Sequence, residues 1–264
     1  MAKQIGVEKS KLTAAEFIKR LKAIQSDKEL EKILKYFKSE KGDYGYGDKF
    51  IGVRMGSIFA MGTEFAEMPI KEIEKLLESD IHEARVGAVS IMDKASRKKK
   101  LSEDRRKEFF DLYMRRHDRI NNWDLVDRSA PFVVGKFLFD KPRDILYELA
   151  HSENMWERRT AIVATDYFIR QGDIADTFKI AEVLLGDHED LIHKAAGGWV
   201  REAGKRDNQK LLDFLDKYAA TMPRTMLRYA IEHLDKKQRE FYLSLKKTGE
   251  NIKSGNERFG NKLK

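Results

Sequence analysis

The sequence contains no cysteine among its 264 residues. The chain therefore has no disulfide bonds, no thiolate metal ligands and no thiol nucleophile, so its core must be held together by packing alone. No apolar run reaches the roughly 18 residues of a membrane-spanning helix, and no stretch has the composition of a signal peptide. We expect a soluble, cytoplasmic protein that does not contact a membrane.

Proline is scarce, with four residues, and no window shows the alternation of apolar and polar residues that is typical of a β-strand. Between the prolines the apolar residues recur at steps of three and four, which is the period of an α-helix. The pattern predicts helices over residues 14–26, 27–37, 71–77, 83–95, 103–115, 144–151, 156–170, 177–185, 191–203, 208–219, 224–234 and 237–245. The chain is therefore expected to be all-α.

A basic residue followed by small and apolar residues recurs on the second helix of successive predicted helix pairs. Its positions are Arg54, Arg85, Arg159, Lys194 and Arg228, and the steps between them are 31, 74, 35 and 34 residues, the step of 74 covering two repeats with Asn122 between them. Helix pairs at this period are typical of HEAT, armadillo and tetratricopeptide solenoids, and the Trp, Gly and Tyr pattern of the last is missing. We therefore predict one HEAT-like solenoid domain over residues 1–245, with a polar lead-in at 1–12.

Positive charge exceeds negative charge, with 52 Lys and Arg residues against 44 Asp and Glu residues and a net charge of +8. Residues 246–264 hold six basic and two acidic residues and few apolar ones, so they are expected to form a disordered basic tail. A second concentration, with eleven basic and five acidic residues, covers residues 94–119 and could contact phosphate or solubilise a helix face. The excess favours an anionic partner.

The recurring basic residues have two interpretations. Each one alone fits a solvated helix face or an ion pair within a repeat, because exposed Lys and Arg need no function. In a solenoid, however, equivalent positions line one continuous concave face, and a basic residue at each makes a stripe that matches a polyanion such as a phosphate backbone. The repeat pattern therefore predicts a concave basic groove.

Familiar catalytic signatures are missing: the sequence has no glycine-rich phosphate loop, no HExxH motif and no nucleophile elbow. His188 and His193 are five residues apart and do not share a helix face, so no metal site is expected.

The segment 118–128 is unusual for a helical repeat. Asn121 or Asn122 can cap a helix there, which places Trp123 and Asp127 on one face. The alternatives are a core role for Trp123 and an ion pair or helix-dipole role for Asp127.

Three motifs, at residues 122–127, 156–162 and 193–202, resemble those of the DNA alkylation repair family of AlkD-type glycosylases. The similarity covers about residues 15–245 in the same order and spacing. It implies a curved HEAT-like stack that holds duplex DNA in its concave groove and removes N3- and N7-alkylated purines. By this resemblance Asp127 is the catalytic carboxylate, Trp123 lies against the deoxyribose of the lesion, and Arg159 contacts phosphate.

The resemblance implies a monofunctional glycosylase of base excision repair that needs neither metal nor cofactor and acts as a monomer on duplex DNA, associated with the nucleoid. An alkylated purine is already cationic and departs readily, so a carboxylate and an indole face need only stabilise the oxocarbenium-like sugar and admit water. Members of the family act with the lesion still stacked, unlike glycosylases that bury an extruded base. The lack of a pocket motif agrees with this.

The sequence departs from the family pattern in two places. The family's third tryptophan aligns with Gly198, whereas Trp199 is one position later and about 100° around the helix unless a bulge restores it. Residues 50–54 resemble the family's N-terminal motif, but Met55 and Gly56 replace a common helix-starting proline. The residues expected to bind DNA are Arg54, Arg85, Arg159, Lys194, Trp199 and Arg201. The alternatives are a non-catalytic protein that binds DNA, including branched DNA, and a solenoid that binds acidic proteins.

Overall fold

The computed structural model describes residues 12–38, 40–41 and 43–245. Within these residues the fold is all-α, as predicted, and extended pairing is limited to an isolated bridge between Lys49 and Ile81. The chain divides into two compact units, the first ending at Pro142 and the second beginning at Arg143. The predicted basic tail 246–264 and the lead-in up to residue 11 lie outside the described residues. The single domain over residues 1–245 stays a prediction.

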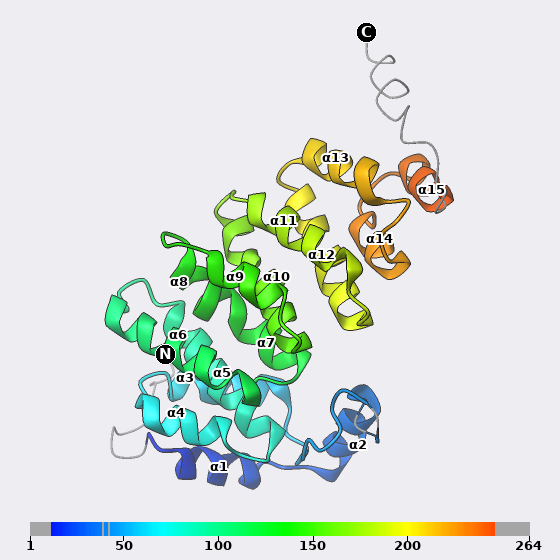
Figure 1. Cartoon of the computed structure of the whole chain (residues 1–264). Helices are drawn as coiled ribbons and strands as arrows, with labels where there is room; N and C mark the ends of the chain where they lie inside the picture. Colours follow the sequence, from blue (N-terminus) through cyan, green and yellow to red (C-terminus); the bar gives the residue numbers. More distant parts are fainter. Residues whose placement is uncertain (1–11, 39, 42, 246–264) are drawn as a thin grey trace, which may run out of the picture. The chain divides into compact units, whose positions relative to one another are not determined.

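The first unit consists of helices stacked in two rows (Figure 1). One row is α1, α4 and α6, and the other is α3, α5 and α7, each helix packing against the next of its row. The bounds are α1 Ala14–Ala23, α2 Asp27–Tyr36, α3 Met55–Glu64, α4 Ile70–Leu77, α5 His82–Ser96, α6 Glu103–Arg115, α7 Trp123–Ser129 and α8 Lys136–Leu138. This stacking of successive helix pairs is the arrangement of a helical solenoid.

The second unit repeats the arrangement. Helices α10, α12 and α14 pack in one row, and α9 packs against α11 in the other. The bounds are α9 Asp144–Ala150, α10 Met155–Arg170, α11 Ala175–Val183, α12 Asp190–Gly204, α13 Asn208–Tyr218, α14 Arg224–Ala230 and α15 Lys236–Ser244. None of the described helices has the length and apolar character needed to cross a membrane.

The recurring basic residues fall on equivalent helices within each unit. Arg54 is the N-cap of α3 and Arg85 lies in α5, while Arg159, Lys194 and Arg228 lie in α10, α12 and α14. The position between Arg85 and Arg159 is occupied by α7, which begins directly after Asn122. The recurring basic residues therefore mark the helices of one row, including α3, for which no helix was predicted.

Most predicted helices agree with the structure to within about two residues, and two end early. The helix predicted over 14–26 ends at Ala23, and the one predicted over 224–234 ends at Ala230. Beyond α14 the apolar Ile231 still faces the core from a turn, with 1% exposure, whereas Ile24 beyond α1 is 47% exposed. Apolar spacing alone cannot distinguish such a turn from a further helical turn.

Helix α5 is the centre of the first unit, because it packs against α1, α3, α4 and α7. All of its residues except Lys94 are buried or nearly so, and a Cβ atom at Gly87 would lie 2.3 Å from the ring of Phe17. The buried charged residues of α5 are His82, Glu83, Arg85 and Asp93. A buried charge is costly unless it is paired, so each of these residues must find partners inside the protein.

Helix α7 is short because a wider turn follows it. Residues Ala130–Gly135 form a π-helical turn that contains Pro131. Proline has no N–H group to donate to the preceding turn, so it interrupts the regular α-helical hydrogen bonds. The regular helix therefore ends at Ser129, only two residues past Asp127.

Candidate active site

Helix α7 begins where the sequence predicted it. Asn122 is the N-cap, and its Oδ1 accepts a hydrogen bond of 2.8 Å from the backbone N–H of Trp123. Trp123 and Asp127 follow at positions i and i+4 and both line a pocket of about 710 Å³ in the first unit. No sequence motif indicated this pocket, because its walls come from α2, α3, α5 and α7.

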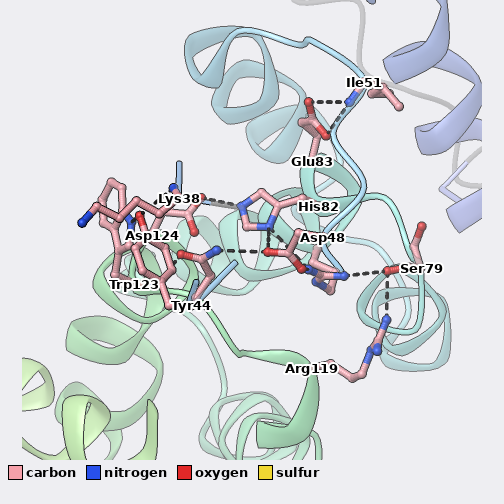
Figure 2. A network of polar contacts seen from close by, with 12 residues as sticks. Lys38, Tyr44, Asp48, Ile51, Ser79, His82, Glu83, Arg119, Trp123 and Asp124 are labelled. Carbon is pink, nitrogen blue, oxygen red and sulfur yellow. Dashed lines mark hydrogen bonds and ion pairs between the residues drawn. The ribbon is translucent and has the colours of Figure 1, made fainter. Parts of the chain in front are cut away.

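The indole of Trp123 is held from several sides. Phe37 stacks on it with 5.5 Å between ring centroids and 15° between planes, and Tyr36 meets it edge-on at 5.8 Å. Its Nε1 donates a hydrogen bond of 3.2 Å to the hydroxyl oxygen of Tyr44 (Figure 2). Trp123 is half-buried, so it is not a core tryptophan. Its orientation is fixed before any ligand binds.

The two carboxylates of α7 have different environments. Asp124 has a side chain that is only 9% exposed and accepts a hydrogen bond from His82 Nε2 at 2.8 Å. Asp127 is exposed and lines the pocket. Asp127 is therefore accessible from the pocket, whereas one oxygen of Asp124 is engaged by the protein.

His82 lies between two carboxylates at the base of α7 (Figure 2). Its Nδ1 is 3.1 Å from Asp48 Oδ2 and its Nε2 is 2.8 Å from Asp124 Oδ2. Burial alone would lower the pKa of His82, but the charge and hydrogen bonds of Asp124 and then Asp48 outweigh it and raise the pKa to about 9. At neutral pH His82 is therefore an imidazolium that ties the loop before α3 to the start of α7.

Arg85 and Asn122 complete this network around Asp48. Arg85 forms an ion pair with Asp48 through Nη2 and donates to the carbonyl oxygen of Ser79 at 3.2 Å. Asn122 Nδ2 donates to Asp48 Oδ2 at 3.0 Å. Arg85, which the sequence assigned to DNA binding, is 3% exposed. Its contacts give it a role in holding the protein together, and its DNA contact stays a prediction.

A buried glutamate fixes the segment that leads into α3. The carboxylate of Glu83 accepts hydrogen bonds from the backbone N–H groups of Ile51, Gly52 and Val53 at 3.0, 2.9 and 3.3 Å. Gly52 has φ of +79°, and a Cβ atom there would lie 2.3 Å from the carbonyl oxygen of Ser26. Only glycine fits this close approach of the backbone.

Arg54 follows this segment at the rim of the pocket. Its side chain is 70% exposed and its Nη2 lies 2.9 Å from Glu29 Oε1, which also binds Lys32 at 2.9 Å. All three residues line the pocket. Arg54, another residue that the sequence assigned to DNA, is therefore accessible to a ligand although it has a partner.

The basic residues between 94 and 119 bind mainly to other parts of the first unit. Arg115 and Arg116 pair with Glu74 and Glu78 on and after α4, at 2.7 and 2.9 Å. Arg106 donates to the carbonyl oxygens of Ser96 and Lys98, which close the end of α5. Much of this concentration therefore joins neighbouring helices.

The remaining predicted DNA-binding residues belong to the second unit. Arg159 is 7% exposed and donates to the carbonyl oxygen of Leu191 at 2.6 Å. Lys194 is 43% exposed and pairs with Asp190 at 2.7 Å. Arg201, with 22% exposure, contacts Glu202 at 3.1 Å and also pairs with Glu232. Lys194 is thus the most accessible of the three.

Trp199 does not take the position that aligns with the family's third tryptophan. Helix α12 is continuous from Asp190 to Gly204, and Trp199 packs against the core cluster of Ile169, Ile174 and Ala203. At Gly198 an added Cβ atom would meet nothing within 4 Å. No bulge restores the register, so the open position of α12 carries a glycine and the indole is half-buried one position later.

The family model described as DNA alkylation repair enzyme matches residues 17–234 of the chain. The chain belongs to the DNA alkylation repair enzyme family. This membership supports a role in the repair of alkylation damage to DNA. It also confirms the family resemblance inferred from the motifs at α7, α10 and α12.

A solved structure described as a predicted DNA alkylation repair enzyme from Enterococcus faecalis is similar to the chain with a TM-score of 0.60 and 16% sequence identity. The similarity covers 80% of this chain and 97% of that one. At this identity the likeness supports the fold alone. No curated protein matches the chain.

Proposed function

We propose that the protein is a monofunctional DNA glycosylase that hydrolyses the N-glycosidic bond of N3- and N7-alkylated purines in duplex DNA, without metal or cofactor. The observation that carries the proposal is the pairing of Trp123 and exposed Asp127 on one face of α7, in one pocket, in a chain of the DNA alkylation repair family. Base release of this kind begins base excision repair.

The chemistry follows from what these two groups can stabilise. The alkylated purine carries a positive charge and leaves with the glycosidic electron pair, so the sugar becomes oxocarbenium-like. A carboxylate at Asp127 stabilises that charge and orients the attacking water, and the indole face of Trp123 stabilises it further. Because Phe37 and Tyr44 already hold Trp123, little reorganisation is needed when DNA binds.

We also propose duplex DNA as the partner and the cytoplasm as the place where the protein acts. A glycosylase with this site would bind duplex DNA as a monomer through cations such as Arg54 and Lys194, and would work in the cytoplasm in association with the nucleoid. Arg159 on α10 and Arg201 on α12 are further proposed DNA contacts of the second unit.

The second candidate is a protein that binds DNA, including branched DNA, without cutting the glycosidic bond. The observation that favours it is the inward packing of Trp199 beside the bare position at Gly198. Because the indole of Trp199 is missing from the open face of α12, the affinity for damaged DNA would be lower. The two candidates differ in whether Asp127 is needed for a chemical step.

Release of 7-methylguanine or 3-methyladenine from methylated duplex DNA separates them. We expect release by the wild type and a loss of at least about 100-fold in Asp127→Asn, as for removal of a fixed electrostatic stabiliser. Asp111→Asn is the matched control, because Asp111 lies on α6, is 45% exposed and pairs with Lys107 at 2.6 Å, away from the pocket. A folded wild type that binds DNA but releases no base would support the second candidate.

A further inference from the structure

Two arginines line the same pocket as Asp127: Arg97, which belongs to the basic concentration over residues 94–119, and Arg128. Arg97 is the C-cap of α5 and Arg128 follows Asp127 in α7. Both bind the same carboxylate: Arg97 Nε lies 2.9 Å from Asp93 Oδ1 and Arg128 Nη2 lies 3.0 Å from Asp93 Oδ2. Asp93 is fully buried, so its carboxylate anchors both guanidinium groups from inside the protein.

An aromatic ring fixes the plane of each guanidinium group. Arg97 lies over the ring of Phe132 with 3.6 Å to the centroid, and Arg128 lies over Phe59 at 4.2 Å. Phe59 also lines the pocket. Each arginine is therefore held by one carboxylate and one ring, which limits the rotamer freedom that it would lose on binding a ligand.

The pair carries more charge than its anchor neutralises. Two guanidinium cations share one buried carboxylate, and the same pocket wall also carries the carboxylates of Asp124 and Asp127. In the described part of the chain, Nε and Nη2 of Arg128 are both buried and form no hydrogen bond, so the contact of Nη2 with Asp93 is an ion pair alone. Burial lowers the pKa of Arg128, Asp93 counteracts this, and Arg97 lowers the pKa further. An anion bound here would stabilise the charged form.

The other pocket cations are held differently. Arg54 and Lys32 also share one carboxylate, Glu29, but their side chains lie at the rim with 70% and 59% exposure, and the imidazolium of His82 lies behind Asp124. Arg97, with 42% exposure, and Arg128, with 19%, share a fully buried carboxylate and each lie over a ring, so they combine accessibility with a fixed orientation. Guanidinium groups match the oxygens of a phosphodiester because they can donate two parallel hydrogen bonds.

We propose that Arg97 and Arg128 form a phosphate-binding pair that takes one backbone phosphodiester of DNA next to the nucleotide presented to Asp127. The placement beside the damaged nucleotide rests on the proposed function, whereas phosphate binding requires only that the pocket faces DNA. The pair would supply, in the first unit, the phosphate contact that the sequence assigned to buried Arg85.

The salt dependence of binding to undamaged duplex DNA tests the pair. The logarithm of the binding constant falls with the logarithm of salt concentration by about 0.9 per phosphate neutralised. We expect Arg97→Gln and Arg128→Gln each to lower this slope by up to that amount, as measured by fluorescence anisotropy. Slopes equal to that of the wild type in both folded variants would overturn the proposal.

Arg105→Gln is the matched control. Arg105 lies over Phe109 at 4.4 Å and pairs with Glu108 at 2.7 Å, so its loss removes the same charge, ring contact and type of ion pair outside the pocket. Its slope should equal that of the wild type. A decrease as large as in the pocket variants would mean that the slope reports net charge alone, which would also overturn the proposal.

A change in the DNA tests the same contact with the unaltered protein. A neutral methylphosphonate is placed at one linkage at a time around an alkylated nucleotide. At one linkage beside the lesion we expect wild-type affinity to fall about tenfold, and Arg128→Gln to be insensitive to that same change. Equal sensitivity of wild type and variant at every linkage would overturn the pair.

The two proposals fail in different ways. A wild type that releases no base but shows the linkage-specific coupling would end the glycosylase proposal and leave the phosphate-binding pair standing. A wild type that releases base with no coupling at any linkage would do the reverse.

Discussion

His82 carries a proton that a histidine in water loses near neutral pH. Its folded-state pKa is about 9, compared with about 6.5 for the free side chain, because Asp48 and Asp124 flank it. Since the folded pKa is the higher one, the contribution to stability is fully present below pH 6.5 and is lost as the pH rises to about 9. Arg85 also binds Asp48, so it supports that carboxylate when His82 loses its proton.

Because the pKa of His82 is raised in the folded state, we expect the folded protein to be less stable at alkaline pH. The free energy of unfolding of the wild type should fall by up to about 3 kcal/mol between pH 6.5 and pH 9, whereas His82→Gln should be less stable at pH 6.5 and nearly independent of pH over this range. Urea titrations of both proteins at three pH values measure the free energy of unfolding. A wild type and variant with parallel pH profiles would show that His82 is not the titrating group.

Two adjacent glycines of α12 allow a second prediction about single residues. A Cβ atom at Gly197 would lie 2.3 Å from the carbonyl oxygen of Met226, whereas one at Gly198 would meet nothing within 4 Å. Gly197→Ala should therefore cost about 1 to 3 kcal/mol through overpacking against α14. Gly198→Ala should gain up to about 1 kcal/mol, because alanine favours the helix.

Thermal unfolding of the two variants compares them directly. Gly197→Ala should melt below the wild type and Gly198→Ala at or above it. The reverse order would mean that the helix face open at residue 198 is occupied in the folded protein.

At the scale of the helix, most of the fold could be predicted from the period of the sequence, and the exceptions have physical causes. Helix α3, Met55–Glu64, was not predicted because its sequence is apolar and small on most sides and lacks a capping side chain. The start of α7 was predicted because Asn122 has the side chain that caps a helix. Asn122 also binds Asp48 across the loop, which no local pattern reveals.

The double role of Asn122 predicts an effect on both stability and activity. Asn122→Ala removes the cap and the hydrogen bond to Asp48, so unfolding should become easier by about 2 to 3 kcal/mol. If α7 presents the catalytic groups, base release should fall as well, because the first turn of α7, which carries Trp123, loses its anchor.

Ser102→Ala is the matched control. Ser102 caps α6, and its Oγ accepts a hydrogen bond of 3.3 Å from the backbone N–H of Arg105. It should cost about 1 kcal/mol and leave base release unchanged. Equal effects of both variants on base release would contradict the positioning role of α7.

At the scale of the whole molecule, the recurring basic residues predicted the repeat more reliably than they predicted a binding surface. In both units they mark the helices of one row, yet Arg85 and Arg159 are buried while Arg54 and Lys194 are accessible. A sequence pattern cannot separate these cases, since burial depends on neighbours far along the chain. Asp48, for example, is hydrogen-bonded to His82, which is 34 residues away in the sequence, and to Asn122, which is 74 residues away. The candidate site was found from Trp123 and Asp127, while the aromatic support from α2 and the Arg97–Asp93–Arg128 cluster required the structure.

Under the proposed function, Asp127 acts on a sugar-centred charge during base release. Single-turnover release of 7-methylguanine at saturating protein, measured together with the dissociation constant for the same DNA, tests it most directly. We expect Asp127→Asn to slow release by at least about 100-fold and to leave the dissociation constant within a few-fold of the wild type. Equal rates for the two proteins, or a slower rate explained entirely by weaker binding, would contradict it.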